Sequence, residues 1–147
     1  MSEANRGVWG VDPPQGAPVS EPVEPAPHPA YLERLDKGVL AYQRCDDCGA
    51  AVFHPRVTCP GCGSGRLAWR ESAGRGTVYS ASALARRDAE PYSVALVDLD
   101  EGFRMMSTVV GVPAGDVRIG MRVRARIEPR DGDRAPRPVF APEEAGR

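Results

Sequence analysis

All four cysteines of the chain lie in one short stretch, and they constrain the fold more than any other feature. They form two C-x2-C pairs, Cys45 with Cys48 and Cys59 with Cys62, separated by ten residues. One such turn places two sulfurs on one side of a metal ion, and a second closes the other side, which gives the four-thiolate tetrahedron typical of structural zinc. A glycine follows each pair directly, and it can take a positive φ that lets backbone N–H groups approach the sulfurs. The spacing therefore predicts a Zn²⁺ site within a zinc ribbon.

Two other interpretations of the cysteines are weaker. A redox dithiol needs one C-x2-C pair beside a βαβ pattern, whereas this chain has two pairs and no such pattern. A disulfide framework belongs to an oxidising compartment, and no secretory leader pattern stands before the pairs. His54 lies between the pairs as a further candidate ligand, but four thiolates already complete a tetrahedron. Because no position is left for water or substrate, we expect a structural ion that does not catalyse.

Composition limits the classes of partner. With 147 residues the chain makes one domain or two very small ones. Its formal net charge of −1 does not favour nucleic acid, because nucleic-acid-binding domains are usually basic. There is no run of about eighteen apolar residues and no basic segment followed by an apolar one. We therefore expect a cytoplasmic protein without membrane contact.

The first 29 residues differ in composition from the rest. Residues 1–29 hold seven of the fifteen prolines and an excess of acidic over basic side chains. Such a segment cannot bury enough apolar surface to offset its ordering entropy, so it is predicted to be a disordered acidic arm. Trp9 is isolated within it and is a candidate anchor for a partner.

Residues 30–38 predict a short helix. Tyr31 and Leu35 are four residues apart and therefore share one face. Gly38 is suited to end the helix in the left-handed conformation.

The ribbon is predicted over residues 39–72. A strand at 39–44 leads into the first cysteine pair, and two short strands at 50–53 and 56–58 are expected between the pairs. Trp69 follows the second pair and is expected to pack between the ribbon and the next domain.

Residues 73–141 are predicted to form an all-β domain, and residues 142–147 are predicted to be a tail. Strand 92–99 is almost continuously apolar, so we expect it to be covered on both faces. Strand 121–127 alternates, with apolar residues facing inward and arginines outward. Five strands within about seventy residues, separated by turn signals, predict a small Greek-key barrel of the OB type. The expected strands are 77–85, 92–99, 103–110, 121–127 and 138–140. The fold class is thus mostly β, with a short N-terminal helix, a zinc ribbon and a small Greek-key barrel.

Four motifs carry a resemblance that covers residues 31–140. They are LAYQRCDDCG at 40–49, GRGTVYS at 74–80, VDLDEG at 97–102 and IGM at 119–121. In this order the chain resembles the zinc-ribbon/OB-fold proteins that accompany acyl-CoA enzymes, and the resemblance implies a rubredoxin-like zinc ribbon followed by an OB barrel. The resemblance implies a non-catalytic subunit of a thiolase-superfamily enzyme (a thiolase, acyltransferase or retro-aldolase) or of an acyl-CoA hydratase. Such a subunit binds and orders its catalytic partner in a hetero-oligomer and helps to position the coenzyme A thioester.

Four arginines are candidate contacts to coenzyme A or to the partner. Arg122, Arg124 and Arg126 alternate along one strand, where a solvated or partner-facing edge is favoured over a phosphate site, and nucleic acid ranks last. Arg75 stands between two glycines, which suit either a tight linker or a close approach to a ligand.

The chain shows no catalytic constellation of its own. No serine, histidine and acidic set stands at a recognisable spacing, so we expect the isolated chain to be inactive. A single-stranded nucleic-acid module of the OB type is the alternative from another class. It would need aromatic side chains on an open face, and Tyr79, Tyr92, Phe103 and Phe140 are few and serve equally well in a core.

Overall fold

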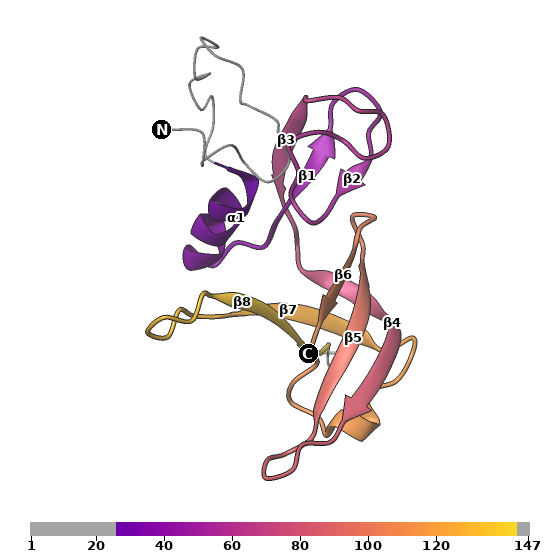
Figure 1. The fold of residues 1–147 in the computed structure, drawn as a ribbon. Helices are drawn as coiled ribbons and strands as arrows, with labels where there is room; N and C mark the ends of the chain where they lie inside the picture. The colour runs from indigo at the N-terminus through magenta and orange to yellow at the C-terminus, as the bar shows by residue number, and fades with distance from the viewer. Residues whose placement is uncertain (1–25, 144–147) are drawn as a thin grey trace, which may run out of the picture.

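The computed structural model describes residues 26–143, so Trp9 and most of the proline-rich arm lie outside the described residues. Within this range the chain forms one α-helix and eight strands in two antiparallel sheets, as Figure 1 shows. The expectation of a mostly β protein with one short helix is confirmed. No helix among residues 26–143 has the length and apolar character needed to cross a membrane.

Helix α1 spans Pro27–Asp36 and begins before the expected residue 30. Proline fits the first helical turn, because its missing N–H would have no partner there. His28, expected in the arm, therefore lies in α1. Gly38 ends the helix as expected: its φ is 81°, and its N–H donates to the carbonyl of Leu35 over 2.9 Å.

The ribbon contributes a three-stranded sheet in the order β2-β1-β3. Its strands are β1 (Ala41–Cys45), β2 (Ala51–Val52) and β3 (Leu67–Glu71). The strand expected at 56–58 does not form. Instead, the buried Gln43 side chain holds this segment, because its amide oxygen accepts from the Arg56 N–H over 2.7 Å and its amide nitrogen donates to the Arg56 carbonyl over 3.0 Å. A side chain of β1 thus replaces the expected ladder bonds.

The barrel contributes a five-stranded sheet in the order β6-β5-β4-β7-β8. Its strands are β4 (Arg75–Leu84), β5 (Tyr92–Leu99), β6 (Arg104–Ser107), β7 (Arg122–Glu128) and β8 (Arg137–Pro142), with a 3-10 turn η2 (Ala114–Asp116) before β7. The two edge strands of this sheet, β6 and β8, approach each other and close the barrel. Just after β6, Val109 forms a parallel bridge with Phe140, and the Ser107 hydroxyl donates to the Pro138 carbonyl over 2.9 Å. This closure gives the Greek-key barrel that the sequence predicts.

Two expectations about the barrel strands are wrong in detail. Along β5 buried residues alternate with partly exposed ones such as Val94 and Leu96, so the strand is fully covered on one face only. The third strand ends at Ser107 and not at residue 110, because the next residues pair with β8: the Phe140 N–H donates to the Thr108 carbonyl over 2.9 Å.

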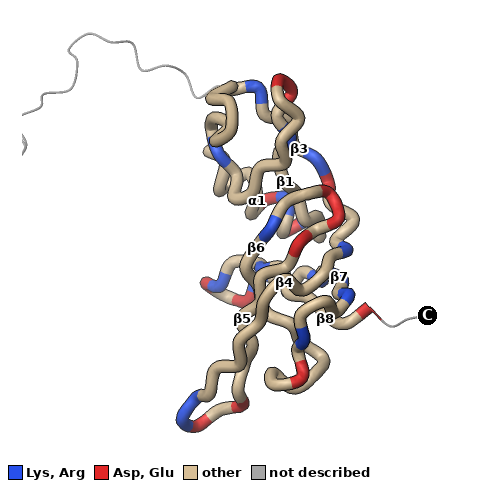
Figure 2. The backbone as a smooth tube through the Cα atoms, turned by 90° about the vertical axis from the view of Figure 1, so that its right-hand side faces the viewer, with Lys and Arg blue, Asp and Glu red and all other residues tan. Residues whose placement is uncertain are grey.

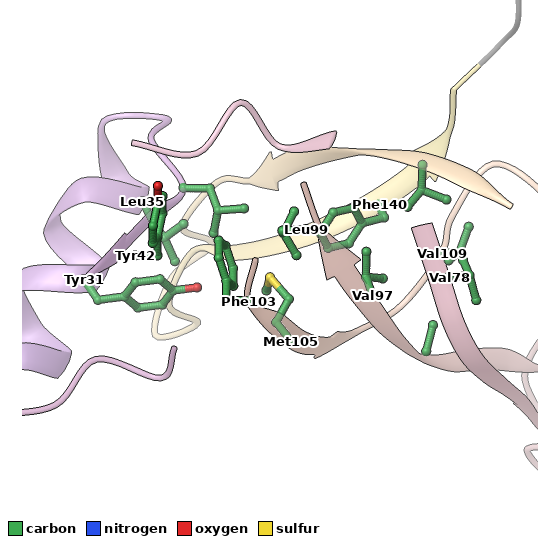
Figure 3. Close-up of a cluster of buried hydrophobic side chains, with 13 residues drawn as sticks. Tyr31, Leu35, Tyr42, Val78, Val97, Leu99, Phe103, Met105, Val109 and Phe140 are labelled. Atoms are coloured by element: carbon green, nitrogen blue, oxygen red, sulfur yellow. The ribbon is translucent and has the colours of Figure 1, made fainter. Parts of the chain in front are cut away.

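One hydrophobic core joins the helix, the ribbon and the barrel. Figure 3 shows Tyr42 lying beside Phe103 of the barrel, with Tyr31 of the helix in the same cluster. The ring centroids of Tyr42 and Phe103 are 4.8 Å apart, and those of Phe53 and Phe103 are 5.2 Å apart. Trp69 is partly buried against this core, as expected for a residue between ribbon and barrel. Ribbon and barrel therefore pack as one unit.

The turn after β5 adds polar bonds between the two parts. The Glu101 carboxylate accepts from the Ser72 hydroxyl and from the Ala73 N–H, each over 2.8 Å. The Glu101 carbonyl accepts from the Arg44 guanidinium over 3.1 Å. This part of the VDLDEG motif holds the barrel against the ribbon.

Candidate metal centre

The four cysteine sulfurs gather at one point at the far end of the ribbon, all within 4.8 Å of one another. Cys45 and Cys62 lie 3.6 Å apart, and Cys48 and Cys59 lie 3.7 Å apart. A tetrahedron with metal–sulfur bonds of about 2.3 Å has sulfurs about 3.8 Å apart. The donor set and its spacing therefore fit a tetrahedral ion such as Zn²⁺.

Both cysteine pairs form the expected turn. The Gly49 N–H donates to the Cys45 carbonyl over 2.9 Å, and the Gly63 N–H donates to the Cys59 carbonyl over 2.8 Å. The two glycines have φ values of 78° and 79°. In the first turn the Cys48 N–H also approaches the Cys45 sulfur at 3.5 Å. Positive φ is needed to close each turn, which explains the glycine after each pair.

The thiols of the cluster differ in acidity. The N–H of Cys48 is the main cause that lowers the pKa of the Cys45 thiol to about 7. For Cys62 the Ser64 N–H acts in the same direction, but the Cys45 thiol, desolvation and the other two thiols together outweigh it and raise the pKa to about 12. Four close sulfurs cannot all carry a negative charge without a compensating cation. A divalent ion would supply that charge.

Polar contacts tie the two cysteine turns together. The Asp47 carboxylate accepts from the Ser64 hydroxyl and from the Arg66 guanidinium, the latter over 3.2 Å. His54 does not join the cluster: its exposed ring stacks on Phe53 with the centroids 4.7 Å apart. The structure therefore brings together the four thiols without the histidine.

The candidate arginines lie on the outer face of β4 and β7, and all four are exposed. Arg75 stands directly opposite Arg124 in the β4–β7 register. Arg122 is engaged within the chain, since it donates two bonds of 2.9 Å to Asp100, and this contact lowers the pKa of Asp100. Arg126 follows two positions along the same strand. The structure thus brings together two like charges and leaves Arg122 committed to a carboxylate.

The glycines around Arg75 approach the chain's own strands. A Cβ on Gly76 would lie 2.6 Å from the Asp98 carbonyl oxygen, closer than real Cβ contacts allow. Gly74 has a φ of 77°, and a Cβ there would lie 3.0 Å from the Cβ of Ala125. These contacts account for both glycines as part of a tight ribbon-to-barrel connection.

The four aromatic residues weighed for nucleic-acid stacking divide into two pairs. Phe103 and Phe140 are buried in the core, whereas Tyr79 and Tyr92 are exposed. The Arg104 guanidinium lies 3.5 Å from the ring centroid of Tyr79.

A cleft of about 1050 Å³ lies beside Tyr92, between the loops of the β4–β5 and β7–β8 hairpins. No motif in the sequence marks it, because its residues come from separate loops. The positions of these two loops in an OB barrel are the one signal that could have indicated it.

Two family models match consecutive parts of the chain. One is the ChsH2 rubredoxin-like zinc ribbon domain, which matches residues 32–68, and the other is the ChsH2 C-terminal OB-fold domain, which matches residues 69–128. The chain belongs to the ChsH2 family. The two models divide this ChsH2-family chain within β3, between the cysteine cluster and the barrel.

Curated relatives of this ChsH2-family chain include two proteins named DUF35 domain-containing scaffold protein. The one from Methanothermobacter thermautotrophicus is 33% identical over 104 residues, which cover 63% of this chain and 78% of the relative. The one from Methanocaldococcus jannaschii is 38% identical over 100 residues, which cover 61% of this chain and 70% of the relative. A probable enoyl-CoA hydratase alpha subunit from Thermomonospora curvata is 37% identical over 98 residues, and the chain spans only 30% of its length.

Two solved structures share the fold. A chain of the Ltp2-ChsH2(DUF35) aldolase matches with a TM-score of 0.71 and 33% identity, covering 82% of this ChsH2-family chain and 98% of the other. A DUF35-family protein of unknown function from Sulfolobus solfataricus matches with a TM-score of 0.57 and 16% identity, and the match covers 78% of this chain and 84% of the other. The second likeness supports the fold alone.

Proposed function

We propose that this ChsH2-family chain is a non-catalytic subunit that binds and orders an enzyme of the thiolase superfamily acting on acyl-CoA thioesters. The observation that carries the proposal is the likeness to a chain of the Ltp2-ChsH2(DUF35) aldolase, which extends over 98% of that chain at 33% identity. The name scaffold protein, given to two relatives, points in the same direction. A thiolase, acyltransferase or retro-aldolase is the expected partner.

An acyl-CoA hydratase is the second candidate partner. It is favoured by one observation, the 37% identity to a protein named as a probable enoyl-CoA hydratase alpha subunit. Because the chain spans 30% of that relative, the ribbon and barrel would correspond to one part of a larger hydratase subunit.

The fold supports a scaffolding role. Helix, ribbon and barrel share one core, so a partner that contacts any of them meets a single packed unit. All four thiols in the chain are gathered in one cluster, where a bound ion would leave none free as a nucleophile.

The metal proposal is that Cys45, Cys48, Cys59 and Cys62 hold one structural Zn²⁺. Because binding free energy is largely folding free energy in small metal domains, Cys48→Ser should lose the metal and the ribbon's structure. Metal analysis of the purified protein and far-UV circular dichroism measure both effects. The His54→Ala variant is the control and should keep one zinc per chain. Full zinc content in Cys48→Ser would refute the ligand set.

Co-purification tests the proposed partner. The tagged full chain, isolated from its host, should carry a thiolase-superfamily enzyme or a hydratase that mass spectrometry identifies. Adding the purified chain to that enzyme should raise its thermal stability and its turnover of an acyl-CoA substrate. A monomeric chain that retains neither type of enzyme would refute the proposal.

The outer arginine face is the proposed contact to the partner or to coenzyme A. Arg75 and Arg124 oppose each other across two strands, an arrangement that is destabilising unless an anion lies between them. Arg124→Ala should therefore slightly raise the melting temperature of the isolated chain and weaken the complex. Arg118→Ala is the matched control, since Arg118 is exposed and stands before β7. Equal effects of the two substitutions on complex affinity would remove the arginine face from the interface.

A further inference from the structure

The cleft in the barrel lies where this fold commonly binds ligands. Strands β4, β5, β6, β7 and β8 are the first to fifth strands of the OB barrel, and the cleft lies between the first–second and fourth–fifth loops. OB folds bind ligands between these loops and over the second and third strands. Tyr92 begins the second strand and Thr108 follows the third, and both line the cleft. The cysteine cluster contributes no residue to this cleft.

The cleft carries an excess of positive charge. Four arginines line it, namely Arg86, Arg130, Arg134 and Arg137, together with two acidic residues. In Figure 2 basic positions are visible at the tip of the β4–β5 hairpin, at the lower end of the barrel. Guanidinium groups gathered from two separate hairpins suit a ligand with more than one anionic group.

Among the described residues, ion pairs neutralise two of these arginines, and the other two have none. Arg130 donates to Asp36 over 2.8 Å, and Arg137 donates to Glu128 over 2.6 Å. Among residues 26–143 neither Arg86 nor Arg134 has a carboxylate partner. Carboxylates therefore fix Arg130 and Arg137, whereas no carboxylate of residues 26–143 neutralises the charge of Arg86 or Arg134.

An aromatic ring adds a second type of contact. Tyr92 is 40% exposed, and the Arg86 guanidinium lies 5.0 Å from its ring centroid. Arg86 is itself oriented by a bond of 3.1 Å to the Glu90 carbonyl. A heteroaromatic base can stack on a tyrosine ring or on a guanidinium plane. The cleft therefore offers a base platform next to cationic groups.

Size and aromatic content select the ligand class. A cleft of about 1050 Å³ is far larger than one inorganic phosphate and is at the upper end of small-molecule sites, which span about 300–1,000 Å³. A single-stranded nucleic acid stacks successive bases on several aromatic side chains, whereas Tyr92 is the one aromatic residue lining this cleft. A single phosphorylated nucleotide matches both observations.

We propose that the cleft between the β4–β5 and β7–β8 loops binds a phosphorylated nucleotide, with its base on Tyr92 and its phosphates on Arg86 and Arg134. Coenzyme A ends in such a nucleotide, and a free adenine nucleotide shares the same chemistry. The nucleotide site stands independently of the partner, and only its assignment to coenzyme A depends on the proposed function.

Isothermal titration calorimetry of the full zinc-loaded chain tests the site at low and at physiological salt. Adenosine 3′,5′-bisphosphate should bind with one site per chain, and the affinity should fall as salt screens the phosphates. Arg134→Ala and Tyr92→Leu should each weaken binding about tenfold, while the control Arg118→Ala leaves it unchanged. Unaltered circular dichroism and melting temperature show that each variant folds.

Each outcome of the titration has a meaning. Tighter binding of coenzyme A than of the bisphosphate supports the site with coenzyme A as the source, and the reverse order supports it with a free nucleotide. No saturable binding of either nucleotide overturns the proposal, as does preferential binding of a dT12 oligonucleotide or of inorganic phosphate. If the catalytic partner co-purifies while no nucleotide binds, this inference fails and the proposed scaffolding function stands.

Discussion

Phe103 is the residue on which the joint between ribbon and barrel should depend most. Its side chain is 5% exposed and stacks on Tyr42 and Phe53, two residues of the ribbon. Truncating a buried phenylalanine to alanine costs about 3–5 kcal/mol. Each aromatic pair contributes about 0.5–1.5 kcal/mol beyond its buried area, so Phe103→Ala should lie in the upper part of that range. Because small domains have a total stability of about 5–15 kcal/mol, the loss is a large fraction of the whole.

Urea unfolding with two probes measures this loss. In a Trp9→Phe background Trp69 is the one tryptophan left, so its fluorescence reports on strand β3 of the ribbon. Far-UV circular dichroism follows the whole chain, in which the barrel holds most of the strand residues. The two transitions should coincide in the starting protein and separate in Phe103→Ala. Phe103→Leu keeps an apolar side chain and should lose about 1–3 kcal/mol from the two stacking pairs.

Met106→Ala is the matched control for this substitution. Met106 lies on the strand that Phe103 leads into, but it is 67% exposed, so its truncation should change stability by no more than about 0.5 kcal/mol. Equal losses in Phe103→Ala and Met106→Ala would refute the shared core. Two separate transitions before any substitution would refute it as well.

Three further substitutions test particular contacts by urea unfolding. Gly76→Ala forces a Cβ against a backbone carbonyl of β5 and should cost about 1–3 kcal/mol, whereas Gly115→Ala meets nothing within 4 Å and should be nearly neutral. Gln43→Leu removes two bonds to the segment between the cysteine pairs and should cost about 1–3 kcal/mol. The bond from Arg122 lowers the pKa of Asp100, so the folded state favours the ionised carboxylate. The resulting stability is present at neutral pH and is lost as the pH falls through the lowered pKa. The difference in unfolding free energy between the starting protein and Asp100→Asn should therefore be constant above about pH 5 and shrink below the usual aspartate pKa of about 3.9. A difference that grows in acid would contradict a stabilising ion pair between Arg122 and Asp100.

The strongest local patterns in the sequence were sufficient to predict their elements. Strand 92–99 is found with the expected bounds, and the alternation along β7 places its arginines outside. The glycine after each cysteine pair has the expected positive φ. In these cases the chemistry of a few adjacent residues decides the conformation, so no distant contact is needed to infer it.

The failures arise where distant segments decide the outcome. The strand expected at 56–58 gives way to bonds from Gln43, thirteen residues away from Arg56. The third barrel strand is shortened by its pairing with β8, which comes some thirty residues later in the chain. The cleft was missed for the same reason, since its two hairpin loops meet only in the closed barrel.

The motifs that carry the family resemblance are largely used to build the fold. Gly76 accommodates a carbonyl of β5, Glu101 binds the ribbon, and Asp100 holds Arg122. Residues with such roles cannot vary freely between partners, because changing them disturbs the barrel itself. Recognition of a particular partner or ligand must then come from side chains that the fold does not need. Arg124 on the outer face and Arg134 in the cleft, exposed and without an ion pair among residues 26–143, are two of the groups that meet this condition.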